Sequence, residues 1–198
     1  MNKINLTLAG AALILALYSC SSENKSAETD TNTTATDSMP TTMSDTSLSN
    51  PADTAGNNVT AFALKAAAGG TMEVELGYMA QQKGQNPRIK QFGAMLVKDH
   101  TKANDELKAL ATTKNIMIPA KLPQDIQQHI DEMKKLGGAE FDKHYIGMMV
   151  DDHQADIKEF EKAAKNSTDE SFKAYAAKTL PVLKMHLDSA KAIKKDIK

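Results

Sequence analysis

The segment from Pro87 to Lys114 constrains the fold more than any other stretch of the chain. Asn86 is a favourable N-cap residue, and Pro87 takes the first helical position, where its missing N–H costs nothing. Apolar residues then recur at helical spacing, at Ile89, Phe92, Leu96, Ala103, Leu107 and Leu110. At about 100° per residue, His100 falls near the centre of this apolar stripe. The pattern predicts one amphipathic helix that carries an imidazole into a core, where other helices must satisfy it.

Three further long helices follow from the same periodicity. The predicted long helices cover about residues 59–82, 87–114, 140–165 and 170–197. Short turns join the first helix to the second and the third to the fourth, so each pair is predicted to be antiparallel. Between the pairs, an extended connection at about 116–123 leads into a short helix at about 124–136, which we expect to lie across one end of the bundle. No strand pattern competes within this region, so the predicted fold class is all-α, a four-helix bundle with a short crossover helix.

Two local features interrupt the regular helical pattern. Gly69 and Gly70 lie in the middle of the first predicted helix, where each costs roughly 1 kcal/mol relative to alanine. We interpret them as sites of close helix approach or as room for a ligand. Pro181 lies inside the fourth predicted helix, where a kink is expected because proline removes one backbone hydrogen bond.

Each of the four long helices places one ionisable residue on its inward face. These residues are Glu73, His100, His153 and His186. Measured from the first turn, Glu73 and His100 differ in height by about 3 Å, and the other two differ by about one helical turn. We therefore predict that the four side chains form a transition-metal site. The alternative is a hydrogen-bonded polar layer without a metal.

Four nearby polar residues are candidates for additional ligands or for groups that orient the ligands. They are Asp142, Tyr145, Asp152 and Asp156. The di-iron pattern of helical bundles needs Glu-x-x-His on two helices, whereas Val97, Val150 and Leu183 stand three positions before the three histidines. A mononuclear, histidine-rich site for Fe, Zn or Cu is therefore the better interpretation, with Mn also compatible with imidazole and carboxylate ligands. His129 and His144 are predicted to be solvent-exposed.

The first 20 residues have the pattern of a bacterial lipoprotein signal peptide. Lys3 precedes an apolar run from Leu6 to Tyr18, which is too short to span a bilayer, and Cys20 follows at the cleavage position. Tyr18 departs from the usual pattern, where a small residue is more common. We predict that Cys20 is lipidated and anchors the protein to a membrane of the cell envelope. An ordinary signal peptide with an incidental cysteine is the alternative.

Residues 21–57 differ in composition from the rest of the chain. They are rich in Ser, Thr, Asn, Asp and Ala, lack aromatic residues and carry six acidic residues and one lysine. Such a segment cannot bury enough apolar surface to fold, so it is predicted to be a flexible tether. The remaining residues, 58–198, have 22 basic and 19 acidic residues, a net charge of +3. This charge does not indicate a nucleic-acid partner, and the region is long enough for one domain with its own core.

Several of these positions together resemble a known family. They are Phe62, Ala67-Ala68-Gly69-Gly70, Glu73, Asn86-Pro87, Met95, Asp99-His100, Phe141-Asp142, Tyr145, His153, Leu180-Pro181 and His186-Leu187. From about Val59 to Ala192 the chain resembles the bacterial envelope family known as domain of unknown function 4142. The resemblance implies a ferritin-like bundle and an exported or outer-membrane-attached protein. It implies no particular activity.

Three functional hypotheses are compatible with the sequence. The leading one is a lipid-anchored bundle that binds a transition metal in its core, with a role in metal or oxidative stress handling. The second is a structural or interaction domain of the envelope whose polar core layer holds no metal. The third is a sensor whose bundle opens when histidines are protonated. No catalytic residue is predicted, and the sequence leaves open whether the protein is an enzyme and which protein partner it has.

Overall fold

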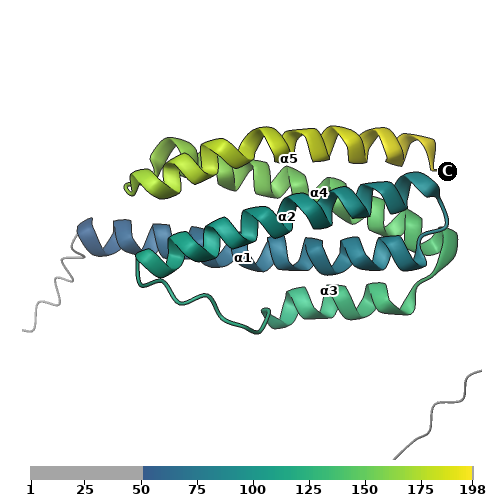
Figure 1. Cartoon of the computed structure of the whole chain (residues 1–198), viewed down its shortest axis with the longest axis horizontal. Helices are drawn as coiled ribbons and strands as arrows, with labels where there is room; N and C mark the ends of the chain where they lie inside the picture. The colour runs from purple at the N-terminus through teal and green to yellow at the C-terminus, as the bar shows by residue number, and fades with distance from the viewer. Residues whose placement is uncertain (1–50, 198) are drawn as a thin grey trace, which may run out of the picture. The chain divides into compact units, whose positions relative to one another are not determined.

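The computed structural model describes residues 51–197, which form five α-helices and no β-strand (Figure 1). The helices are α1 (Pro51–Lys83), α2 (Pro87–Thr113), α3 (Gln124–Lys135), α4 (Gly138–Asn166) and α5 (Glu170–Asp196). The all-α prediction is therefore confirmed for the part of the chain that the structure describes. The four long helices and the short crossover helix occur in the predicted order.

Capping residues fix the starts of two long helices. The Asn86 side chain accepts a hydrogen bond from the backbone N–H of Arg88 at 2.8 Å, and Pro87 occupies the first turn, as the sequence predicts. At the start of α5, the Asp169 carboxylate accepts from the N–H groups of Ser171 and Phe172. Both caps satisfy N–H groups that have no partner inside the helix.

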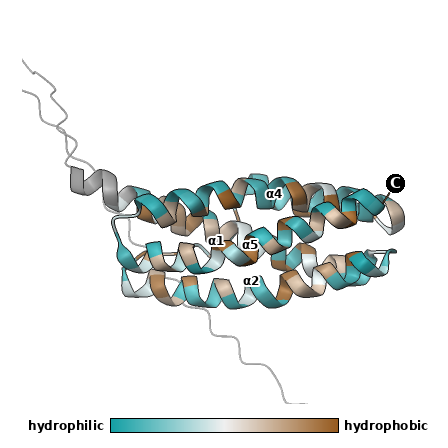
Figure 2. Ribbon diagram, turned by 90° about the horizontal axis from the view of Figure 1, so that it is seen from above, coloured by the Kyte–Doolittle hydropathy of each residue, from teal (hydrophilic) through white to brown (hydrophobic). Residues whose placement is uncertain are grey.

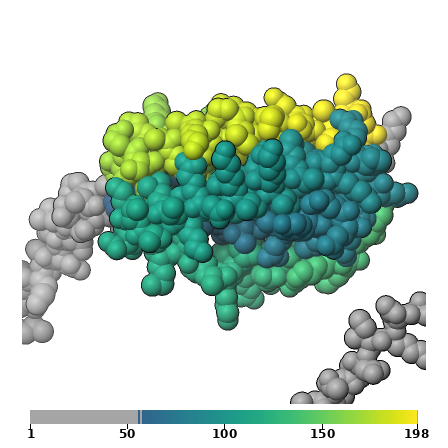
Figure 3. Space-filling view, viewed as in Figure 1, coloured from purple at the N-terminus to yellow at the C-terminus, as the bar shows by residue number. Residues whose placement is uncertain are grey.

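The four long helices pack as two antiparallel pairs. α1 packs along α2 and α4 packs along α5, with narrower contacts between α1 and α4 and between α2 and α5. α1 and α5 therefore lie on one diagonal of the bundle, and α2 and α4 lie on the other. Figure 2 shows hydrophobic residues recurring along each ribbon, and in the space-filling view side chains fill the space between the helices (Figure 3).

The crossover helix lies elsewhere than predicted. α3 does not cross one end of the bundle but runs alongside α1, against which it packs, and it also touches α4 (Figure 1). Its buried residues Ile130 and Met133 are three positions apart, so they lie on one apolar face of the helix. This face is buried when the helix packs lengthwise against another helix. At its end, the Lys83 ammonium donates to the carbonyl groups of Lys134 and Leu136 and ties α3 to the end of α1.

α1 begins earlier than predicted. We expected the helix to start near Val59 after a tether ending at residue 57, but it starts at Pro51. Proline is favoured in the first turn, and an established helix can extend without an apolar face of its own. The predicted signal peptide, the lipidation site Cys20 and residues 21–50 of the tether lie outside the described residues and stay predictions. Within the described part, no helix is both long and apolar enough to cross a membrane.

The buried apolar residues form two clusters along the bundle. The α3 cluster includes Leu76, Phe92, Leu96, Ile130, Phe141, Tyr145 and Met149. The Phe172 cluster includes Ala63, Ala67, Leu107, Phe160, Phe172, Tyr175 and Leu183. In every long helix, the residues of one cluster precede those of the other along the chain. The inward ionisable residues of the sequence prediction lie between them.

A glycine contact brings α1 and α2 close together. A Cβ atom at Gly93 would lie 2.6 Å from the carbonyl oxygen of Gly77 and 2.7 Å from Cβ of Ala80. At Gly77 it would lie 2.8 Å from the carbonyl oxygen of Gly93. The sequence analysis did not single out this pair, because its spacing across two helices is visible only once their register is known.

Pro181 is accommodated inside a continuous α5. The carbonyl that loses its helical partner belongs to Ala177, and both residues are exposed, so water can bind this group. The expected kink stays a prediction.

We expect Gly93→Ala to lower the free energy of unfolding by about 1–3 kcal/mol, because the added methyl group forces two helix backbones apart. Gly147→Ala is the matched control: its Cβ would meet nothing within 4 Å. There, the better helix propensity of alanine should raise the free energy of unfolding by up to about 1 kcal/mol. Urea denaturation of both variants measures the difference. Equal effects of the two substitutions would contradict the close contact.

Candidate metal centre

The four predicted residues meet in one buried layer. Glu73 on α1, His100 on α2, His153 on α4 and His186 on α5 are exposed by 1%, 6%, 0% and 0%. On each helix, the residue lies between members of the α3 cluster and members of the Phe172 cluster. We call these four side chains the polar layer. The inward orientation of these four side chains was predicted correctly from helical periodicity. Glu75, two positions after Glu73, is exposed as expected.

The three imidazole rings form a nearly equilateral triangle. Their centroids lie 5.7 Å apart for His100 and His153, 5.2 Å for His100 and His186, and 5.3 Å for His153 and His186. One ring nitrogen from each lies within 4.8 Å of the other two. The centre of such a triangle is at most about 2.8 Å from each nitrogen, so shifts of less than about 1 Å would give the 2.0–2.1 Å of zinc–imidazole bonds.

Each ring has one nitrogen in contact with an acceptor. His153 Nδ1 lies 2.9 Å from the carbonyl oxygen of Met149, and His186 Nε2 lies 3.0 Å from Oδ2 of Asp99. His100 Nδ1 lies 3.0 Å from Oε2 of Glu73. The Met149 carbonyl only accepts hydrogen bonds, so it places the ring proton of His153 on Nδ1, and Asp99 and Glu73, when ionised, place the other two protons on the nitrogens that face them.

The other nitrogen of each ring has no partner. His100 Nε2, His153 Nε2 and His186 Nδ1 are buried and make no hydrogen bond within residues 51–197. Burial lowers the pKa of all three imidazoles, that of His100 to about 4, so the rings are neutral near pH 7. A neutral imidazole with one nitrogen protonated keeps a lone pair on the other. The layer therefore presents three unpaired lone pairs from three helices, the donor set that a transition metal binds.

Glu73, which we predicted as a metal ligand, lies beside two of the rings. Its Oε2 is 3.0 Å from Nδ1 of His100, and its Oε1 is 3.3 Å from Nδ1 of His153 and has no hydrogen-bond partner among the described residues. The carboxylate is not a member of the group of three histidine donors. Burial raises its pKa, and the nearby His153 ring opposes this shift. A carboxylate at this place can orient the two rings, and its role as a ligand stays a prediction.

Asp99 contacts the polar layer, a role that the sequence analysis did not predict. Its carboxylate, half-buried on α2, accepts the hydrogen bond from His186 on α5. This contact raises the pKa of His186, against the larger lowering by burial. Its position beside His100 in the sequence is the only local signal. Pairing with a residue 87 positions later depends on the register of two helices.

Asp142 is not part of the polar layer, although we predicted it as a neighbour. Its carboxylate accepts hydrogen bonds from the backbone N–H groups of Gln85, at 3.0 Å, and Asn86, at 2.7 Å, in the turn between α1 and α2. It precedes His153 by eleven residues, about 16 Å along the helix. The burial of Asp142 is explained by these hydrogen bonds, which connect α4 to the turn between α1 and α2.

The other three predicted neighbours lie nearer the layer. Tyr145 is buried, stacks on Phe141, and has a hydroxyl group without a partner among the described residues; burial and Glu73 raise its pKa. Asp152 and Asp156 are half-buried on α4, and burial followed by the charge of Glu73 raises the pKa of each to about 7. His129 and His144 are exposed, as predicted.

The two sides of the polar layer differ in chemistry. On the side of the α3 cluster, the Phe92 ring lies 6.5 Å from His153 and 6.4 Å from His186, edge-on to the latter. On the side of the Phe172 cluster, a cavity of about 10 Å³ adjoins Glu73 and His100. Its lining includes Gly70, Asn104, Asp156, Tyr175 and Thr179. This volume is about that of one water molecule by the same measure.

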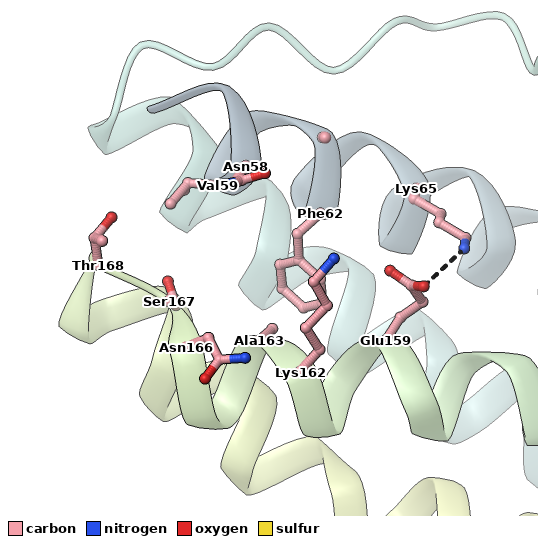
Figure 4. A pocket seen from close by; sticks show the side chains of 11 residues that line it. Asn58, Val59, Phe62, Lys65, Glu159, Lys162, Ala163, Asn166, Ser167 and Thr168 are labelled. Atoms are coloured by element: carbon pink, nitrogen blue, oxygen red, sulfur yellow. Dashed lines mark ion pairs between the residues drawn. The ribbon is translucent and has the colours of Figure 1, made fainter. Parts of the chain in front are cut away.

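A larger cavity, of about 180 Å³, lies elsewhere, where the first described turns of α1 meet the end of α4 and the turn after it (Figure 4). Phe62 and Val59 form part of its wall, and the Lys65–Glu159 ion pair, at 3.4 Å, lines one side. It shares no lining residue with the polar layer or with the small cavity. This cavity is therefore separate from the candidate metal centre.

A family model for "Domain of unknown function (DUF4142)" matches residues 43–193, which include the polar layer and all five helices except the C-terminal end of α5. The chain belongs to this family. The resemblance noted from the sequence is thus confirmed, whereas the family description assigns no activity. Comparisons with curated proteins and with solved structures give no significant match.

The raised pKa of Asp156 predicts a pH-dependent effect of its substitution. The unfolded carboxyl ionises near 3.8 and the folded one near 7, so this group removes stability as the pH rises between these values. Asp156→Asn should raise the free energy of unfolding of metal-free protein by about 1–3 kcal/mol at pH 8, and change it little at pH 4. Denaturant titrations at both pH values test this. The exposed Asp151→Asn control should stay within about 0.5 kcal/mol of wild type.

Proposed function

We propose that this protein binds one transition-metal ion in the core of its helical bundle, through Nε2 of His100, Nε2 of His153 and Nδ1 of His186. The observation that carries the proposal is the set of three buried ring nitrogens without a hydrogen-bond partner, on rings whose donor atoms lie within 4.8 Å of one another. Leaving one such group unpaired costs about 1–3 kcal/mol. Three in one place are accounted for together by a ligand that accepts three lone pairs.

The contacts of the protonated nitrogens support the same proposal. Ligating histidines characteristically donate their other N–H to a carboxylate or a backbone carbonyl, which fixes the tautomer and the ring orientation. Here His153 faces Met149 O and Glu73, His186 faces Asp99, and His100 faces Glu73. A histidine layer serving only to connect the helices by hydrogen bonds does not account for one buried, unpartnered nitrogen on each of three neighbouring rings.

The donor set restricts the class of metal. Three neutral imidazoles suit Zn, Cu, Fe and Ni, whereas Mg and Ca prefer oxygen ligands. The described helices contain no Glu-x-x-His pair, so the proposed site is mononuclear and differs from di-iron carboxylate centres. Three histidines also resemble the ligand count of catalytic zinc sites, which keep one further position for water or substrate.

The wider role that we propose is metal or oxidative stress handling at the cell envelope. It combines the core site with the predicted lipid anchor at Cys20 and with a ferritin-like arrangement of the four long helices. The family match and the two antiparallel helix pairs are compatible with this proposal. The second candidate, a metal-free interaction domain, predicts instead that the polar layer only connects the helices.

Replacing one proposed ligand should abolish stoichiometric metal binding. Natively purified or Zn-reconstituted wild type should contain about one ion per chain, whereas His100→Leu and His186→Leu should lose at least about 100-fold in affinity, because two imidazoles remain. His144→Ala is the control, because His144 is an exposed histidine of α4. Elemental analysis and calorimetric titration provide the readout, with circular dichroism to confirm folding.

The same samples decide between the two candidate functions. Added metal should raise the melting temperature of wild type and of His144→Ala, because a ligand that binds only the folded state stabilises it. If metal leaves wild type unchanged, or if His186→Leu retains the full metal content, the site that we propose does not exist and the polar layer is structural.

Glu73→Gln tests the positioning role of the carboxylate. The amide keeps the size of the side chain but cannot accept through both of its terminal atoms, so one of the two rings faces an N–H group in place of an oxygen. We expect a fall of about 10–100-fold in metal affinity with the stoichiometry unchanged. Glu75→Gln, on the exposed face of the same helix, should bind like wild type. Complete loss of stoichiometric binding in Glu73→Gln would instead make Glu73 a ligand.

A further inference from the structure

The small cavity beside His100 has a position and a lining that the three-histidine site does not by itself explain. It adjoins the polar layer at His100 and Glu73, and all four long helices contribute to its wall. Its volume, about 10 Å³, is at the lower limit for holding one water molecule. Most of its wall is apolar, but an amide, two carboxylates, an imidazole and two hydroxyl-bearing side chains also line it, so the wall offers polar partners to a small ligand.

Two of the polar side chains in the wall already have partners. The Tyr175 hydroxyl donates to the carbonyl oxygen of Ala103 at 3.3 Å, and the Thr179 hydroxyl donates to the carbonyl oxygen of Tyr175 at 2.9 Å. The amide of Asn104 and the carboxylate of Asp156 are therefore the groups in the wall that can form hydrogen bonds with a small ligand. The Asp156 carboxyl group lies on the turn of α4 that follows His153.

The opposite side of the polar layer is covered by an aromatic ring. The Phe92 ring lies edge-on to His186 and close to His153, and it belongs to the α3 cluster. A three-histidine centre therefore has Phe92 on one side and, on the other, a cavity of water size with polar groups in its wall. This asymmetry is expected where three protein ligands leave a fourth position for an exogenous group.

We propose that the cavity lined by Asn104 and Asp156 receives the fourth ligand of the bound metal, a water molecule or an anion of at most two heavy atoms. The inference rests on the proposed metal site and deepens it. With this fourth ligand, the metal centre has one position that can exchange ligands. A purely structural metal site instead has all of its positions filled by protein ligands. The volume of the cavity limits how far the ligand can extend beyond the atom that binds the metal.

Two adjacent glycines provide a matched pair of variants. Gly70 lines the cavity, and a Cβ there would lie 2.2 Å from Oδ1 of Asn104, the flexible end of that side chain. Gly70→Ala therefore puts a methyl group at the cavity wall and displaces the amide while the helix backbones can stay in place. At Gly69 a Cβ would make only ordinary contact, 3.9 Å from Oδ1 of Asp156, and Gly69 does not line the cavity.

The experiment uses the full chain loaded with Co²⁺, whose visible absorption bands respond to a change of ligand. Wild type and Gly69→Ala should bind one Co²⁺, and cyanide should shift the bands, with thiocyanate at least tenfold weaker because it is longer. Gly70→Ala should bind Co²⁺ like wild type but respond to cyanide with at least a tenfold higher dissociation constant. Cobalt content measured after each titration shows that the anion has not removed the metal.

The outcomes separate this inference from the proposed function. If Co²⁺ binds through the three histidines but neither anion changes the bands, the position is closed and the inference is wrong, while the metal site stands. If cyanide binds equally well to Gly70→Ala and wild type, the ligand does not occupy this cavity, which also overturns the inference. If Co²⁺ does not bind at all, the proposed function itself fails.

Discussion

The contact of the Glu73 carboxylate with two imidazoles controls how this bundle can bury four ionisable groups in one layer. A carboxylate in an apolar core is costly to ionise, and the raised pKa of Glu73 expresses that cost. The ring N–H of His100 compensates part of it, at 3.0 Å from Oε2 of Glu73. Oε1 of Glu73 lies 3.3 Å from Nδ1 of His153 but has no hydrogen-bond partner among the described residues, because that ring nitrogen contacts the Met149 carbonyl. One buried acid and one backbone carbonyl therefore set the tautomers of two rings.

The polar layer also divides the core energetically. The α3 cluster and the Phe172 cluster each bury aromatic and aliphatic side chains, and such burial is the main favourable term in folding. The layer between them has three unpaired ring nitrogens, which oppose folding until something binds them. Because the donors come from α2, α4 and α5, a bound ion would connect three helices, and its binding energy would contribute to the stability of the bundle.

Most of the fold and the membership of the polar layer could be predicted from the sequence, because both depend on helical periodicity, which is local. The inward faces of Glu73, His100, His153 and His186 follow from an angle of about 100° per residue. Counting residues away from the two short turns places Glu73 and His100 within about 3 Å in height, but it leaves His153 and His186 about one helical turn apart. The same reasoning correctly left His129 and His144 exposed.

The parts that were not predicted depend on contacts between helices. The side of α1 that α3 covers, the glycine contact of α1 with α2 and the turn that Asp142 binds all require the register of distant segments. The role of Glu73 required side-chain torsions, since the helical wheel places its Cα but does not say which nitrogen it faces. Asp99 was missed because its partner comes from α5, which no pattern within α2 reveals.

Charge balance gives the arrangement its chemical character. The three donors are neutral, so a divalent ion bound there would keep its full charge among its direct ligands, and the carboxylates of Glu73 and Asp99 would compensate it from beyond the rings. Ligands of this kind leave a metal able to attract a further anion or to polarise a water molecule. A cavity with polar groups in its wall adjoins the layer beside His100, whereas Phe92 lies on the other side. The remaining charge of a bound ion would therefore act toward Asn104 and Asp156, where the small volume limits the size of the group that could respond to it.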